Sequence, residues 1–199
     1  MVGREGELVV AGVRPDVKEF LERCKLNGLQ VAYVRSIEAL LSVLTDWASG
    51  WGVRWIILGG LSKGLSEKIR GEFTGRSGCK VLEIGDAETE IGELRTSSLG
   101  VFRANAGIKE TGGLVIFDNW ASNLASLIPE YSVALLEEGE ILQDYWMLTP
   151  VIRQTRPGGI VIISGPSSTS DIELTPIIGV HGPVGCGCIV AGIELDEQV

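Results

Sequence analysis

The stretch PDVKEFLERCKLNGLQVAYVRSIEALLSVLTDWASGWGVRWIIL, residues 15–58, alternates segments of helical period with short apolar runs. Its apolar residues between Val17 and Cys24 fall at i, i+3, i+4 and i+7, the spacing of one helix face. Pro15 suits a first helical turn, and Asn27-Gly28 is a C-terminal stop. Strand, helix and strand follow at once, the pattern of an α/β fold with a mostly parallel sheet.

The same alternation continues on both sides of this stretch. The expected strands are Leu8–Val13, Leu29–Val34, Trp55–Leu58, Lys80–Ile84, Leu114–Phe117, Ser132–Leu136, Ile160–Ile163 and Cys186–Ile193. The expected helices begin at Pro15, after the cap Ser36, at Lys63 (to Phe73) and at Ser122 (to Leu127), with a further helix over Ile141–Thr155 that breaks near Pro150. Residues Gly85–Ser98 are acidic and are interpreted as a short helix and a surface loop. We therefore expect an open, mostly parallel sheet with helices on both faces, with residues 1–199 as a single domain.

Composition narrows the classes of partner and location. Among the 199 residues, 45% are hydrophobic, which excludes a disordered chain. No apolar run approaches the roughly 18 residues of a spanning helix, and no secretory signal is visible, so we expect no membrane span and a cytoplasmic location. The net charge is −9, and residues 110–199 hold two arginines against 12 acidic residues. Nucleic acid is not expected as a partner, because binding phosphates requires a basic face.

The four cysteines are Cys24, Cys79, Cys186 and Cys188. None belongs to a C-x-x-C pair, so no metal or iron–sulfur site is predicted within this chain. Alternation along a strand places the thiols of Cys186 and Cys188 on one face, where small buried core residues are the favoured interpretation over a redox pair.

One glycine-rich turn is a weak nucleotide candidate. In Gly59-Gly60-Leu61-Ser62-Lys63-Gly64, Leu61 occupies the place where a dinucleotide motif requires its second glycine. The segment is interpreted as a tight turn between a strand and a helix.

A stronger signal is Gly165-Pro166-Ser167-Ser168-Thr169-Ser170-Asp171-Ile172-Glu173, after an expected buried strand. Two interpretations stay open. Backbone N–H groups and hydroxyls at the carboxyl ends of strands would bind a carboxylate or phosphate. Alternatively, the spacing of Ser170 and Glu173 is that of a capping box, in which the turn satisfies the first donors of a helix.

Two further segments carry groups for proton transfer and nucleophilic attack. The only histidine, His181, lies in Gly179-Val180-His181-Gly182-Pro183, where either a proton-transfer role or a structural role fits. Glu110, in Lys109-Glu110-Thr111-Gly112-Gly113, is either a solvated loop carboxylate or a nucleophile or base beside a glycine turn.

Together these segments resemble the LUD-domain family of lactate-utilisation proteins. The matching segments are Lys109–Gly113, Leu124–Pro129, Ser164–Glu173 and Gly179–Pro183, in the same order and spacing. The resemblance implies a fold like that of ribose-5-phosphate isomerase and the CoA transferases. This chain departs from the family at Ser168, where members usually have arginine, and at Gly113, where they usually have threonine. Without the guanidinium, an anion at this turn would depend on hydroxyls, backbone N–H groups and Lys109.

The resemblance implies a role as an accessory or subunit in iron–sulfur-dependent oxidation of L-lactate to pyruvate, with iron–sulfur proteins as partners. A stand-alone enzyme of the acyl-transfer or ligase type, or a module that senses a small carboxylate or nucleotide, are the alternatives. For the enzyme alternative, the candidate catalytic residues are Glu110 and His181. The candidate ligand-binding residues are Thr111, Gly112, Gly165, Pro166, Ser167, Thr169, Asp171, Glu173 and Gly182. The sequence identifies no cofactor, and a homo-oligomer stays open.

Overall fold

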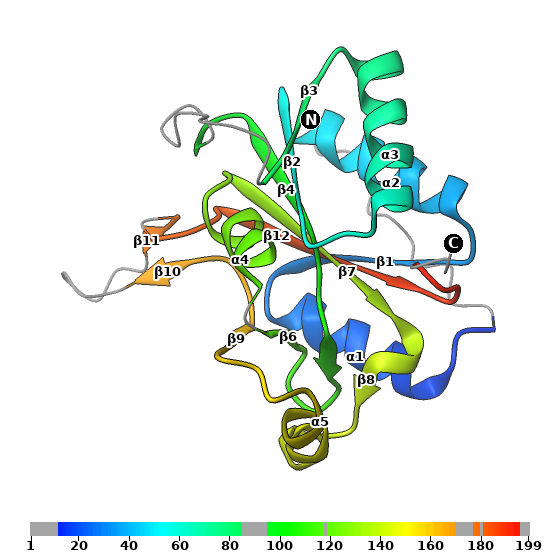
Figure 1. The fold of residues 1–199 in the computed structure, drawn as a ribbon, viewed down its shortest axis with the longest axis vertical. Helices are drawn as coiled ribbons and strands as arrows, with labels where there is room; N and C mark the ends of the chain where they lie inside the picture. The colour runs from blue at the N-terminus through cyan, green and yellow to red at the C-terminus, as the bar shows by residue number, and fades with distance from the viewer. Residues whose placement is uncertain (1–11, 85–94, 118, 170–176, 180, 196–199) are drawn as a thin grey trace.

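The computed structural model describes residues 12–84, 95–117, 119–169, 177–179 and 181–195 (Figure 1). Within these residues, the main sheet has six parallel strands in the order β1-β12-β7-β4-β2-β3. In chain order they are β1 Leu29–Val34, β2 Trp55–Gly59, β3 Lys80–Glu83, β4 Ser98–Arg103, β7 Tyr131–Glu137 and β12 Gly185–Ala191. The expectation of an open, mostly parallel α/β sheet is confirmed.

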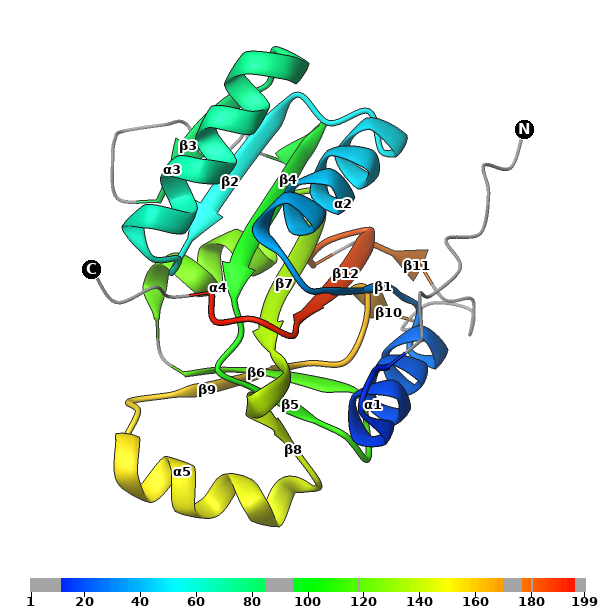
Figure 2. The same cartoon turned by 90° about the vertical axis from the view of Figure 1, so that its right-hand side faces the viewer.

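Helices cover both faces of this sheet (Figures 1 and 2). They are α1 Pro15–Leu26, α2 Ile37–Gly50, α3 Lys63–Glu72 and α4 Trp120–Leu127. From β1 through β3 the chain moves along the sheet in one direction, and from β4 through β12 it returns. Because parallel crossovers share one hand, reversing the direction along the sheet moves the connecting helix to the opposite face. Helices α2 and α3 therefore lie on one face, and α4 lies on the other face together with α1.

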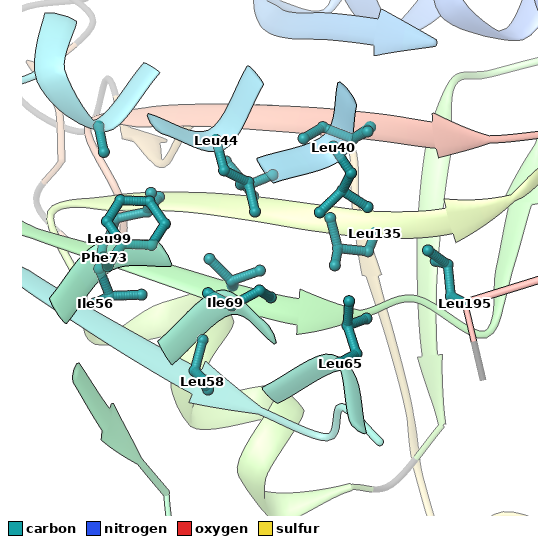
Figure 3. Packing of buried hydrophobic residues seen from close by; sticks show 14 of the residues in the cluster. Leu40, Leu44, Ile56, Leu58, Leu65, Ile69, Phe73, Leu99, Leu135 and Leu195 are labelled. Atoms are coloured by element: carbon teal, nitrogen blue, oxygen red, sulfur yellow. The ribbon is translucent and has the colours of Figure 1, made fainter. Parts of the chain in front are cut away.

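Two apolar layers fill the space between the helices and the sheet. In the first, Leu40 and Leu44 of α2 and Leu65 and Ile69 of α3 pack on one face of the sheet (Figure 3). The sheet residues labelled in that layer are Ile56, Leu58, Leu99 and Leu135. In the second layer, the stripe from Val17 to Cys24 of α1 packs on the opposite face, as its spacing predicts. Cys186 and Cys188 belong to this second layer, which confirms the core interpretation of both thiols.

Helix α4 approaches the sheet unusually closely, at two glycines. A Cβ at Gly59 of β2 would overlap the carbonyl of Ala121, and one at Gly100 of β4 would overlap that of Ala125. The glycines therefore set the depth at which α4 packs.

A second, smaller sheet has the order β8-β5-β6-β9. It is drawn below the main sheet in Figures 1 and 2. Its strands are β5 Ala106–Ile108, β6 Gly113–Phe117, β8 Ile141–Leu142 and β9 Ile160–Ile163. Helix α5, Leu148–Thr155, packs on it through Leu148 and Ile152. The remaining elements are β10 Ser168–Thr169, β11 Ile177–Ile178, the π-turn Phe73–Ser77 and the 3-10 turns Glu138–Glu140 and Tyr145–Met147.

Several sequence-based predictions differ from the structure. Strand β4, buried in the middle of the main sheet, was not predicted, because Gly100 interrupts its apolar run; β5 was not predicted either. The expected helix over Ile141–Thr155 is instead a strand, a 3-10 turn and α5. Pro150 does not break α5, because it occupies the first turn, where no N–H partner is required. Strand β9 is not buried: it is an edge strand with Ile160 and Ile162 exposed.

Two predicted segments fall on parts of the chain that are not described. The strand Leu8–Val13 lies outside the described residues except for Gly12 and Val13, which are not in a strand. Most of the acidic segment Gly85–Ser98 also lies outside them, and its last residue, Ser98, begins β4.

Candidate functional site

The Glu110-Thr111-Gly112 segment forms the tight turn between β5 and β6. The amides of Thr111 and Gly112 both donate to the carbonyl of Ile108, at 3.2 and 2.8 Å. Gly112 has a φ of +69°, in the left-handed region that favours glycine. The amide of Glu110 donates to the carbonyl of Gln143 at 3.2 Å, and the Glu110 side chain is exposed. The carboxylate is therefore presented to solvent from a fixed backbone.

This turn rests directly on the C-terminal part of α1. A Cβ at Gly112 would lie 2.7 Å from the backbone nitrogen of Cys24 and 2.8 Å from the carbonyl carbon of Arg23. The side-chain amide of Asn27 donates to the carbonyl of Thr111 at 2.7 Å. Only glycine at position 112 allows the turn to pack this closely on α1. The hydrogen bond from Asn27 holds the turn there.

The second turn, Gly165-Pro166, lies against the same asparagine. A Cβ at Gly165 would come within 2.6 Å of the carbonyl oxygen of Asn27. Pro166 packs beside Gly28, with its Cδ 3.6 Å from the position a Cβ would take there. The Asn27-Gly28 pair thus lies between the two turns and holds both.

Ser167 links this turn to the histidine segment. Its amide donates to the carbonyl of Pro183 at 3.0 Å, and its carbonyl accepts from the amide of Gly179 at 2.8 Å. The hydroxyl of Ser167 accepts from the backbone amide of His181 at 3.3 Å, while the imidazole is exposed. A Cβ at Gly182 would lie 3.2 Å from that of Ser167. Ser167 therefore positions the backbone of His181.

The serine-rich turn does not lie where the sequence placed it. We expected it at the carboxyl ends of the parallel strands. Instead Gly165 contacts Asn27, just before β1, and Ser167 bonds to Pro183, just before β12, so the turn is at the amino ends of neighbouring strands. The reason is that β9, the strand before it, belongs to the small sheet.

The expected helix after this turn is not present at its first residues either. Ser168 and Thr169 form β10, which pairs antiparallel with Ile178 and Ile177. The predicted ligand residues Asp171 and Glu173, and the proposed capping by Ser170, lie outside the described residues.

The structure thus brings most of the candidate residues onto one continuous surface. Asn27-Gly28 joins the Thr111-Gly112 turn to Gly165-Pro166, and Ser167 continues the contacts to His181 and Gly182. Within the described residues, however, no hydrogen bond joins the side chains of Glu110 and His181. The two candidate catalytic groups are parts of one surface rather than a bonded pair.

Sequence reasoning missed two residues of this surface. Asn27 was interpreted only as a helix stop, although its side-chain amide can also donate a hydrogen bond to a turn that packs against the helix end. Tyr145 was placed in a helix; its hydroxyl lies 3.2 Å from the Thr111 hydroxyl. No local pattern marks Tyr145, because the contact joins segments that are 34 residues apart.

Lys109, which we expected to assist an anion, is already engaged. Its ammonium lies 3.0 Å from a carboxylate oxygen of Glu19 on α1, and its side chain is only 14% exposed. The residue is better described as a second tie between this turn and α1. Its ammonium is therefore not free to assist an anion at the Gly165 turn.

A second polar cluster lies at the carboxyl ends of β4 and β7. Arg103 contacts both carboxylate oxygens of Glu140, at 2.7 and 2.8 Å, and Glu137 at 2.9 Å. Glu137 also accepts from the amide of Leu195 at 2.9 Å. Burial raises the pKa of Glu140, and Arg103 opposes that shift. Arg103 and the two glutamates pair with one another, and Glu137 also holds the backbone at Leu195. We therefore interpret the cluster as structural.

The cysteines are placed as core residues. All four are buried and free. Burial raises the pKa of Cys186, and the adjacent Cys24 thiol together with burial raises that of Cys188, so both are held as neutral thiols. Among the described residues, no group of three or more His, Cys, Asp or Glu side chains is arranged to hold a metal ion. In the same residues, no helix is long and apolar enough to cross a membrane.

Comparison with known proteins agrees with the motif set. A family model described as the LUD domain matches residues 17–190, which include both turns, Asn27 and His181. The chain belongs to the LUD-domain family. A solved structure of a DUF162 family protein from Deinococcus radiodurans covers 89% of this chain and 96% of its own, with a TM-score of 0.61 and 22% identity. That likeness supports the LUD fold described above.

Two curated relatives of this LUD protein show the range of similarity. It is 36% identical over 128 residues to the uncharacterized protein YkgG of Escherichia coli K12, covering 61% of this chain and 54% of the relative. It is 24% identical over 193 residues to lactate utilization protein C 1 of Bacillus mycoides KBAB4, covering 92% of this chain and 80% of the relative. The chain thus spans about half the length of the first relative.

Proposed function

We propose that this LUD protein acts in lactate utilisation, as an accessory protein or subunit in the iron–sulfur-dependent oxidation of L-lactate to pyruvate. Support comes from the family match over residues 17–190 and from relatives named lactate utilization protein C, in Bacillus mycoides and in Shouchella clausii. A cytoplasmic location, expected from the sequence, is part of the same proposal.

The observation that carries the proposal is the joint surface held by Asn27-Gly28. Two motif-bearing turns, distant in sequence, are fixed on either side of these two residues. Such a surface offers the Ser167 hydroxyl to a small carboxylate, with the exposed imidazole of His181 beside it as a proton carrier. A 2-hydroxy acid supplies both the carboxylate and the proton-bearing hydroxyl.

The redox step points to protein partners. Oxidation of L-lactate to pyruvate releases two electrons and two protons. The four buried cysteines of this chain serve its core, and Cys186 and Cys188 remain protonated thiols, so they are poor candidates for cluster ligands. In this proposal, the electrons pass to iron–sulfur partner proteins, and His181 accepts a proton.

A thermal-shift titration of the purified protein tests the ligand part of the proposal. L-lactate and pyruvate should each raise the melting temperature, since a ligand at 100 times its Kd stabilises by about 2.7 kcal/mol. His181→Ala and Ser167→Ala should remove the shift. Ser168→Ala, an exposed serine next to Ser167, is the matched control and should keep it. Failure of both acids to shift the melting temperature would contradict the ligand assignment.

Affinity purification from the native host tests the partner part separately. We expect cysteine-rich iron–sulfur proteins to copurify with the tagged chain. A chain that purifies alone, from cells growing on L-lactate, would contradict the subunit role even if the ligand shift is seen.

An acyl-transfer enzyme is the second candidate, and the exposed carboxylate of Glu110 beside Gly112 favours it. Here a carboxylate oxygen attacks the carbonyl carbon of an acyl-CoA thioester, the C–S bond breaks, and CoA leaves as its thiolate, giving an acyl-glutamyl anhydride. Glu110→Gln should then abolish turnover of any accepted thioester. Unchanged turnover in this variant would exclude the mechanism, and ligand binding without turnover would favour a sensing module.

A further inference from the structure

The small sheet ends at β9, and the outer edge of that strand has no partner strand within the described residues. On its inner side β9 pairs antiparallel with β6, from Ile160 opposite Phe117 to Ile163 opposite Leu114. The strand reads Ile-Val-Ile-Ile, with no charge and no proline. Natural proteins usually protect such an edge with charges, prolines or a covering segment, because its free N–H and C=O groups invite another strand.

Two side chains of β9 add exposed apolar surface next to this edge. Val161 and Ile163 pack into the core, whereas Ile160 and Ile162 are 38% and 42% exposed. Next to them is the 3-10 turn Tyr145–Met147, in which Trp146 is 84% exposed. We call the five residues the β9 patch: Tyr145, Trp146, Met147, Ile160 and Ile162.

The two parts of the patch meet at Gly113. A Cβ built at Gly113 would have the Cγ2 of Ile162 at 3.2 Å and the hydroxyl of Tyr145 at 3.3 Å. The side chains of Tyr145 and Ile162 thus lie beside the same glycine, which brings the turn and the strand together. Contiguous exposed apolar surface of this kind marks interaction sites.

Charges of opposite sign flank the two ends of β9. Arg153 and Arg156, at the end of α5, precede Ile160, and both are exposed. Glu110 and Asp144 lie at the other end. The turn that carries Glu110 leads into Gly113, which precedes Leu114, the partner of Ile163. The Glu110 amide also donates to the carbonyl of Gln143, the residue before Asp144. Within the described residues, neither arginine has an ion-pair partner.

We propose that a second copy of this chain binds to the β9 patch, by antiparallel pairing of β9 with its equivalent across a two-fold axis. Antiparallel pairing brings the Arg153 and Arg156 end of one copy to the Glu110 and Asp144 end of the other. Parallel pairing would place like charges together. The surface is therefore complementary to itself, as an isologous dimer requires, and the two small sheets become one continuous sheet.

Sedimentation equilibrium of the purified full chain tests this inference. The wild type should form a dimer. Ile162→Lys places a charge on both copies at the interface and should raise the dimer Kd by about 100-fold or more. Leu127→Lys is the matched control: Leu127 is similarly exposed, at 45%, but lies on α4, and the dimer should persist. A monomeric wild type, or equal dimerisation of Ile162→Lys and wild type, would overturn the proposal.

Two additional variants separate the interface from a folding defect. Ile162→Thr keeps a β-branched residue in the strand while removing apolar contact, so it should weaken the dimer with an unchanged circular dichroism spectrum. Arg156→Glu should also weaken the dimer, and pairing this variant with Glu110→Arg should restore it. If the double variant dimerises no better than Arg156→Glu alone, the antiparallel arrangement is wrong. Because these measurements need no ligand, their outcome is independent of the proposed function.

Discussion

Replacing Gly112 by alanine tests the contact that holds the Glu110–Gly112 turn on α1. The added Cβ meets two costs. The first is conformational: a φ of +69° is disfavoured for alanine by about 1–2 kcal/mol. The second is steric: the Cβ would lie 2.7 Å from the nitrogen of Cys24 and 2.8 Å from the carbonyl carbon of Arg23. Both are backbone atoms of a helix, so relief requires moving the turn, at about 1–3 kcal/mol.

Gly52→Ala is the matched control for this experiment. Gly52 has nearly the same φ, +66°, but no heavy atom lies within 4 Å of the position of its Cβ. It should therefore lose only the conformational part, about 1–2 kcal/mol. The gain from reducing the freedom of the unfolded chain, about 0.4–1 kcal/mol, is common to both variants and cancels in the comparison.

Urea denaturation at neutral pH gives the free energy of unfolding for both variants. We expect Gly112→Ala to be less stable than Gly52→Ala by about 1–3 kcal/mol, the steric cost alone. If the two variants lose the same free energy within about 0.5 kcal/mol, the turn does not press on α1 as described.

Three further predictions concern other contacts. Asn27→Ala should lower the free energy of unfolding by about 1–2 kcal/mol in urea denaturation, because the 2.7 Å bond to the Thr111 carbonyl is lost; an unchanged value would mean that Asn27 does not hold the turn. Ser62→Ala should cost about 1 kcal/mol, because the Ser62 hydroxyl accepts from the Leu65 amide at the start of α3; Ser36→Ala at the start of α2 is the parallel case. Burial raises the pKa of Glu140 in the folded protein, so the folded state binds the proton more tightly than the unfolded state. The unfolding free energy of the wild type relative to Glu140→Gln should therefore rise as the pH falls from the raised pKa toward the ordinary glutamate value; a difference that is constant with pH would contradict this.

Local patterns predicted the elements that carry a clear period. The stripe of α1, the cap Ser36 and strand β1 are all found where the sequence placed them, since each depends on neighbours within a few residues. Strand β4 was missed because the reason for Gly100 is a helix packed against it from a distant segment. The exposure of β9 was missed because an isoleucine-rich run looks the same at a sheet edge as at a sheet centre.

In the candidate site too, local motifs were predicted and contacts between distant segments were missed. The motifs identified Gly112, Gly165 and Ser167, and the structure gives a contact for each of them. Gly165 and Ser167 lie at the amino ends of the neighbouring strands and not at the carboxyl ends as predicted, because β9 belongs to the small sheet. Asn27 and Tyr145 were missed because their partners in the Thr111 turn are 84 and 34 residues away.

Consumption of L-lactate by cells that lack this chain tests the proposed function most directly. The proposal predicts that removing the chain stops oxidation of L-lactate to pyruvate, and that expressing the wild type restores it while His181→Ala, produced at the same level, does not. Cells that oxidise L-lactate at the wild-type rate without the chain would contradict it.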